Sequence, residues 1–147
     1  LQKLEPELAG APAATRAEFL TQMSAARMRL GQNDAAMNAA EQVIALGKSL
    51  HDNVIIAKGM LARTYVLFAQ ADVDAAHRLA FDAEKLALTT SDIALKVQAT
   101  ITAGQTYAEQ GNFPAALLKL QHAVDQARPP AGDSISLVAA LNALAKL

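Results

Sequence analysis

The chain has 147 residues, with 13 basic and 14 acidic side chains and a net charge of −1 at pH 7. This length suits one domain with its own hydrophobic core. The balanced charge argues against nucleic-acid binding, which needs a basic surface, and the absence of cysteine excludes disulfide bonds and thiolate metal sites. No uncharged stretch approaches the roughly 20 residues of a membrane-spanning helix, so we expect no membrane contact by this segment.

Helix-forming residues dominate the composition. Ala and Leu make up more than a third of the chain, whereas Gly and Pro together number 12. The apolar spacing predicts an all-α fold with helices over residues 15–30, 34–49, 53–69, 73–88, 92–110, 114–128 and 134–147. Short loops make neighbouring helices antiparallel.

The ends of the chain suggest a longer protein. We expect residues 1–14 to be an N-terminal lead or the remnant of a preceding helix, and residues 15–147 to form one helical domain. The chain opens on Leu1 without a methionine and stops at Leu147 within an apolar pattern, so we interpret it as a fragment.

Short polar residues mark the expected helix starts. Thr15 and Glu18 have the spacing of a capping box. The other candidate N-caps are Asn33 or Asp34, Asp52 or Asn53, Asp72, Ser91, Asn112, and Asp133 or Ser134. Gly47 and Lys48 are expected to end the helix over residues 34–49.

Three segments repeat at intervals of 40 residues: 31–36, 71–76 and 111–116. Each unit would contain two helices joined by the repeated turn, which predicts a stack of helix pairs. Gly31 and Gly111 suit that turn, where a positive φ is often needed.

The third unit carries Gly104, Tyr107, Gly111 and Ala116 at a spacing that resembles the tetratricopeptide repeat. The resemblance implies a superhelical solenoid in which Gly104 and Ala116 allow close helix approach and Tyr107 fills the adjacent space. The other units match less well, although the first keeps Gly31 and Ala36 and the second keeps Ala76. A solenoid of the HEAT class and an irregular Ala-rich bundle are the alternative folds.

Residues for catalysis are sparse. His51, His77 and His122 have unrelated spacings, and a metal site needs several converging ligands. The tripeptide 47–49 resembles the end of a phosphate loop, but Gln42 stands where that motif needs glycine. We therefore expect no enzyme activity, no metal and no cofactor.

The resemblance also implies that the first helix of each pair lines a concave groove. The groove-facing positions would include Glu18, Gln22, Ala25, Met28, Leu61, Phe68, Thr102, Val138 and Leu141. The residues expected to contact a ligand are Arg29, Lys58, Tyr65, Gln98, Gln105, Glu109 and Asn142. Amides can bond a peptide backbone, and aromatic side chains can anchor it, so we expect a scaffold or regulatory module that binds a protein or peptide.

Two further interpretations remain open. The long units resemble those of tetratricopeptide-like arrays fused to transcription regulators, histidine kinases or diguanylate cyclases, which implies a sensory or regulatory segment of a bacterial signalling protein. The apolar final helix, over residues 134–147, could instead mediate homodimerisation. We expect a cytoplasmic location, with the periplasm as the alternative, because the absence of cysteine leaves the compartment open.

Overall fold

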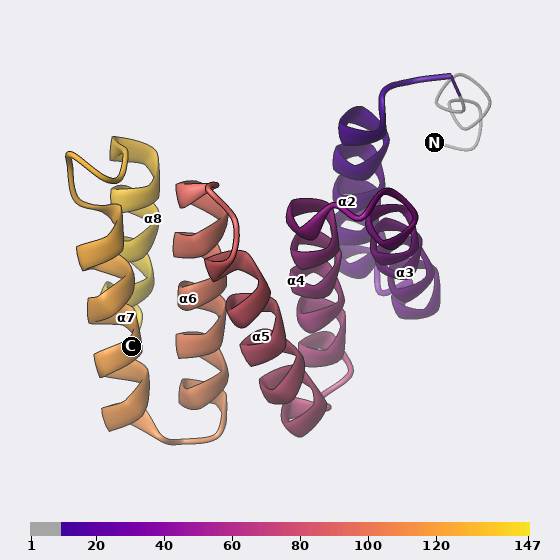
Figure 1. Cartoon of the computed structure of the whole chain (residues 1–147). Helices are drawn as coiled ribbons and strands as arrows, with labels where there is room; N and C mark the ends of the chain where they lie inside the picture. The colour runs from indigo at the N-terminus through magenta and orange to yellow at the C-terminus, as the bar shows by residue number, and fades with distance from the viewer. Residues whose placement is uncertain (1–9) are drawn as a thin grey trace.

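The computed structural model describes residues 10–147, which form seven α-helices and no strand. The helices are α2 (Ala13–Arg29), α3 (Asn33–Leu50), α4 (Asn53–Ala69), α5 (Val73–Leu88), α6 (Ile93–Glu109), α7 (Phe113–Ala127) and α8 (Ser134–Ala145). They follow one another in a row from α2 and α3 at one end to α7 and α8 at the other (Figure 1). The all-α prediction is confirmed for this part of the chain, and most of the expected N-terminal lead lies outside it.

The helices pack as a solenoid of pairs. α2 packs against α3, α4 against α5, and α6 against α7, while the first helices α2, α4, α6 and α8 also contact one another in sequence. Alanines fill the interfaces: Ala36, Ala76 and Ala116, one from each second helix, are all fully buried. Their small side chains let the helices approach closely, so the core lies in narrow interfaces between neighbouring helices.

Five helices begin at a short polar side chain that accepts a hydrogen bond from a backbone N–H in the first turn. These N-caps are Asp52, Asp72, Asp92, Asn112 and Asp133. Each such cap typically contributes about 1 kcal/mol. At Asp133, the backbone N–H of Ser136, followed by the Ser136 hydroxyl, lowers the pKa of the carboxyl below its ordinary value of 3.8.

Three of the expected helix starts are wrong. α2 begins at Ala13 after Pro12, so the Thr15–Glu18 capping box lies inside the helix. The N-cap of α3 is Gln32, without a side-chain bond, and neither Asn33 nor Asp34 caps it. α6 is capped by Asp92 and not by Ser91. The turn at Gly31 is so short that α3 begins at Asn33, directly after Gln32, and Asn33 and Asp34 both lie within the helix.

The repeated turns have the same backbone geometry. Gly31 and Gly111 have φ of +73° and +75°, and Ala71 occupies the equivalent place with φ of +60°. At each turn two N–H groups bond back to carbonyls of the preceding helix, as in Gly31 to Met28 and Gln32 to Arg27. The 40-residue spacing is therefore a repeat of structure as well as of sequence.

Glycine marks close helix contacts within and between the pairs. A Cβ added to Gly104 would lie 2.9 Å from the Leu120 side chain, so Gly104 permits the close contact between α6 and α7. Gly47 lies inside α3, which continues to Leu50 and ends at His51 in the left-handed conformation. The expectation that Gly47 stops this helix is wrong, because its missing side chain serves the contact with α4, where an added Cβ would lie 2.6 Å from the Ile56 nitrogen.

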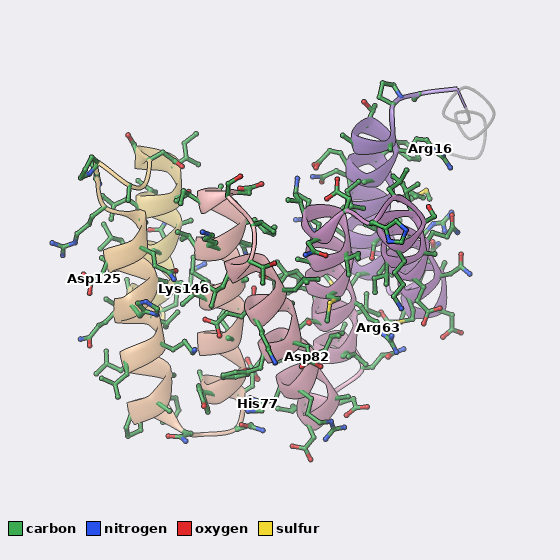
Figure 2. The ribbon with its side chains drawn as sticks, viewed as in Figure 1. Arg16, Arg63, His77, Asp82, Asp125 and Lys146 are labelled. Carbon is green, nitrogen blue, oxygen red and sulfur yellow. The ribbon has the colours of Figure 1, made fainter. Side chains whose placement is uncertain are left out.

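Tyr107 joins two successive pairs. Its ring packs edge-on against His77 and Phe81 of α5, with ring centroids 5.0 and 5.3 Å away. Figure 2 shows His77 on α5, where its Nδ1 lies 2.9 Å from the Thr106 hydroxyl of α6. Tyr107 therefore fills space between the second and third pairs. None of the described helices has the length and apolar character needed to cross a membrane.

Candidate functional site

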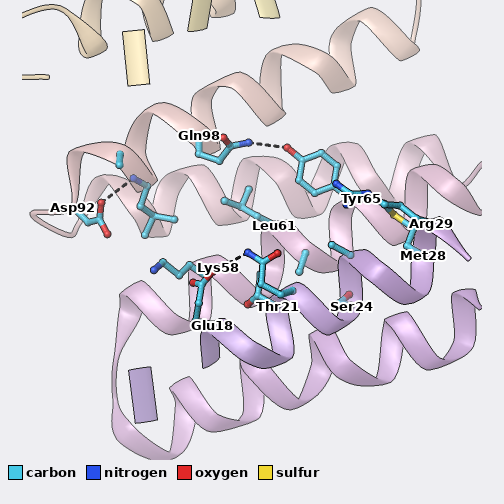
Figure 3. Close-up of a pocket in the computed structure, with 15 residues that line it drawn as sticks. Glu18, Thr21, Ser24, Met28, Arg29, Lys58, Leu61, Tyr65, Asp92 and Gln98 are labelled. Carbon is cyan, nitrogen blue, oxygen red and sulfur yellow. Dashed lines mark hydrogen bonds between the residues drawn. The ribbon is translucent and has the colours of Figure 1, made fainter. Parts of the chain in front are cut away.

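The first helices line a cavity of about 550 Å³. Figure 3 shows its walls, which come from α2, α4 and the beginning of α6. Nine of the residues expected to face a groove line it: Glu18, Gln22, Ala25, Met28, Arg29, Lys58, Leu61, Tyr65 and Gln98. These nine positions therefore lie on one surface of the molecule.

A second cavity of about 330 Å³ lies farther along the same surface. It is lined by Tyr65, Phe68, Gln105, Ala108, Glu109, Leu120, Ala143, Lys146 and Leu147. Tyr65 lines both cavities, so its side chain forms part of the boundary between them. The arrangement is a surface with two neighbouring hollows across four first helices.

A closed set of hydrogen bonds holds Tyr65 at this boundary. Gln98 Nε2 donates to the Tyr65 hydroxyl oxygen at 2.8 Å, and the Thr102 hydroxyl donates to the backbone carbonyl oxygen of Gln98 at 2.9 Å. Because this uses the only hydroxyl proton of Thr102, Tyr65 must donate in the 3.0 Å contact between the two hydroxyls. Tyr65 therefore presents mainly its ring to a ligand, and Gln98 keeps its amide oxygen and one N–H.

The rim of the larger cavity carries charges of both signs. Glu18 and Asp92 are acidic, and Arg29 and Lys58 are basic. Within the described chain, none of these four side chains takes part in an ion pair. Asp92 is occupied as the N-cap of α6, but the two basic groups can still accept an acidic partner.

The structure places Asn142 outside both cavities, on an exposed part of α8. The N-caps of α4 and α6 are 40 residues apart, but those of α6 and α8 are 41 apart. One residue turns a helix by about 100°, which moves Asn142, Val138 and Leu141 away from the expected groove positions. Ala143 and Lys146 line the second cavity instead.

Several lining residues were not expected from the sequence. In the larger cavity these are Thr21, Ser24, Ala62, Asp92, Ala94 and Leu95, and in the smaller one they include Leu120, Lys146 and Leu147. Thr21 and Ser24 share the helical spacing of Glu18 and Ala25, which could have identified them. The contribution of α7 through Leu120 has no such signal, because it depends on how closely Gly104 lets the two helices approach.

The described residues contain no group of three or more His, Cys, Asp or Glu side chains that could hold a metal ion. The histidines lie apart: His51 ends α3, His77 packs in the aromatic cluster, and His122 is exposed on α7. No model of a known protein family and no curated protein matches this sequence.

Proposed function

We propose that this chain is a non-enzymatic, tetratricopeptide-like module whose groove binds a peptide segment of a partner protein. The observation that carries the proposal is the pair of neighbouring cavities across the first helices, with the ring of Tyr65 at their boundary. A cavity of about 550 Å³ is within the range of ligand-binding pockets.

The chemistry of the larger cavity supports a peptide ligand. Leu61 and Leu95 are buried beside it, while Arg29 and Gln98 are exposed at its edge. Apolar side chains of a peptide can pack against the leucines, and its backbone or acidic groups can bond to the exposed polar side chains. Since helices form the walls, the surface is largely preformed and binding costs little ordering of the protein.

A selection of short peptides from a random library tests the proposal. Ala62→Gln places a longer side chain within the larger cavity, and both residues favour a helix. We expect the selected peptides to bind this variant at least tenfold more weakly. Ala45→Gln, on the exposed side of α3, is the matched control and should bind normally. Failure to select any peptide, or equal binding by both variants, would overturn the proposal.

The exposed face of α8 favours a second candidate function, in assembly. Val138 and Leu141 are 56% and 46% exposed, and they occupy the positions of Val97 and Thr100, which lie on α6 and are almost completely buried. In the third pair this region of the first helix packs in the core with α7. α8 therefore presents an unpaired apolar face among the described residues.

As this second function, the α8 face would pair with α8 of another copy. Such a dimer would suit a regulatory or sensory segment of a multidomain bacterial signalling protein, because dimerisation can bring output domains together. Sedimentation equilibrium should then show a concentration-dependent dimer that Leu141→Glu abolishes. A monomer at the highest measurable concentration would exclude this function and leave peptide binding unaffected.

A further inference from the structure

The smaller cavity lies at the carboxyl-terminal ends of three first helices. Phe68 lies in the last turn of α4, Glu109 is the last residue of α6, and Lys146 is the C-cap of α8. The carboxyl end of a helix carries a partial negative charge, which attracts cations. The carboxyl ends of three helices around the smaller cavity therefore give it a negative electrostatic potential, to which the charged side chains add their own contributions.

The side chains of the cavity add two features that suit a cation. The rings of Tyr65 and Phe68 lie with centroids 6.5 Å apart and are tilted by 52°, and aromatic faces attract guanidinium and ammonium groups. Glu109 is exposed and has no ion-pair partner among the described residues. A carboxylate beside aromatic rings can therefore bind the charged end of a ligand side chain.

The remaining walls suit the aliphatic stem of that side chain. Ala108, Leu120 and Ala143 are apolar, and long basic side chains pack their methylene groups against such surfaces while keeping the charge near water. Lys146 has the opposite effect, since its charge repels a cation. Its ammonium group is more than 4.0 Å from Glu109, because no ion pair joins them, so the carboxylate remains available.

We infer that the smaller cavity binds an arginine side chain of the peptide ligand. The guanidinium would lie at Glu109 and the aromatic rings, and the stem would pack against Ala108, Leu120 and Ala143. This inference rests on the proposed peptide-binding function and names one residue type that the peptide carries. The larger cavity, which has apolar walls and a rim of mixed charge, would bind the part of the peptide beyond the ring of Tyr65.

The inference can be tested without knowing the partner. The probe is N-acetyl-arginine amide, titrated into the ¹⁵N-labelled chain and followed by amide chemical shifts. N-acetyl-citrulline amide has nearly the same shape without the charge, and guanidinium chloride has the charge without the stem. We expect the arginine probe to shift the amides of Gln105, Ala108 and Glu109 saturably, and to bind about fivefold more tightly than either comparison compound.

Three variants locate the site. Glu109→Gln should weaken the arginine probe about fivefold, whereas Lys146→Ala should strengthen it, because removing a like charge lowers the repulsion. Asp82→Asn removes an exposed carboxylate of α5 that lies outside both cavities, and it is the matched control, for which we expect no change. Circular dichroism spectra should be the same for all four proteins.

Equal binding of the arginine and citrulline probes, or equal binding of the arginine probe and guanidinium, would overturn the inference. So would shifts confined to the larger cavity, or unchanged affinity in Glu109→Gln. The two proposals fail separately: peptides selected from the library that bind the groove without arginine, and that do not respond to Glu109→Gln, would contradict the cation site but support peptide binding. A library that yields no binding peptide would contradict the groove itself.

Discussion

Replacement of Gly59 by alanine should destabilise the protein, although helix propensity alone predicts the opposite. Gly59 is buried in α4, where it faces α3. A Cβ at this position would lie 2.8 Å from the backbone nitrogen of Ile44, 2.7 Å from its Cγ1 and 3.1 Å from the Cβ of Val43. The backbone nitrogen belongs to the helix α3 and cannot move without shifting that helix.

The expected change in the free energy of unfolding is the sum of two opposing contributions. In an exposed helix interior, glycine to alanine stabilises by about 1 kcal/mol. Overpacking a close interface typically costs about 1–3 kcal/mol, and here backbone displacement places the cost at the upper end of that range. We therefore expect Gly59→Ala to lower the free energy of unfolding by about 1–2 kcal/mol, which corresponds to a fall in Tm of roughly 2–8 °C.

Urea denaturation followed by circular dichroism measures this change. Gly104→Ala is the matched control, because the three nearest contacts of its added Cβ would all be side-chain atoms: Cδ2 and Cγ of Leu120 at 2.9 Å and Cβ of Lys119 at 3.5 Å. That control should change stability by less than Gly59→Ala. Stabilisation of Gly59→Ala by about 1 kcal/mol would show that α3 and α4 separate at little cost, and would refute the reasoning.

Three other predictions concern helix ends and turns. Gln32 occupies the N-cap place of α3 without a side-chain bond, so Gln32→Asp should stabilise by about 1 kcal/mol in urea denaturation. Ala71 has φ of +60°, so Ala71→Gly should stabilise by about 0.5–1 kcal/mol, since relief of the strain exceeds the added entropy of the unfolded chain. The pKa of Asp133 is lowered, so its contribution to α8 is present above pH 3.8 and lost as the pH falls through the lower folded value, which NMR titration of its carboxyl carbon and of the α8 amides will follow.

Each of these predictions has its own control. Gln32→Glu should give little gain, because the longer side chain does not suit the cap. Gly111→Ala should destabilise by about the amount that Ala71→Gly stabilises, since an added Cβ at Gly111 meets no neighbour within 4 Å. Asp133→Asn keeps an acceptor but removes the ionisable group, so the acid-dependent loss of α8 should disappear. A titration midpoint at or above 3.8 for Asp133 would contradict the third prediction.

Much of the local structure follows directly from the residue types. The apolar spacing correctly predicted the all-α fold, and the 40-residue repeat predicted the stack of helix pairs, because the turns at Gly31, Ala71 and Gly111 share one backbone geometry. Aspartate or asparagine at the N-caps made several helix starts predictable, because these short side chains accept a hydrogen bond from a backbone N–H of the first turn. These features depend on interactions within a few residues along the chain.

The candidate site was only partly predictable. The helical period brought Glu18, Lys58 and Tyr65 to one surface, as the sequence suggested. The hydrogen bonds that engage the Tyr65 hydroxyl come from a different helix, so no pattern within α4 indicates them. Asn142 was misplaced because the loop before α8 changes the repeat by one residue, and a small change in loop length becomes a large rotation of the helix.

The sequence by itself determined the helices, the turns between them and the repeated pairing, since these depend on local backbone preferences and on apolar spacing. The tertiary structure decided the contacts between residues that lie far apart in the sequence. Gly47 and Gly59 serve the contact between α3 and α4, and Tyr65 lies at the boundary between the two cavities. A glycine within a helix lowers the local helix propensity in the same way wherever it occurs. Only the position of the neighbouring helix shows whether its missing side chain leaves open space or permits a close contact.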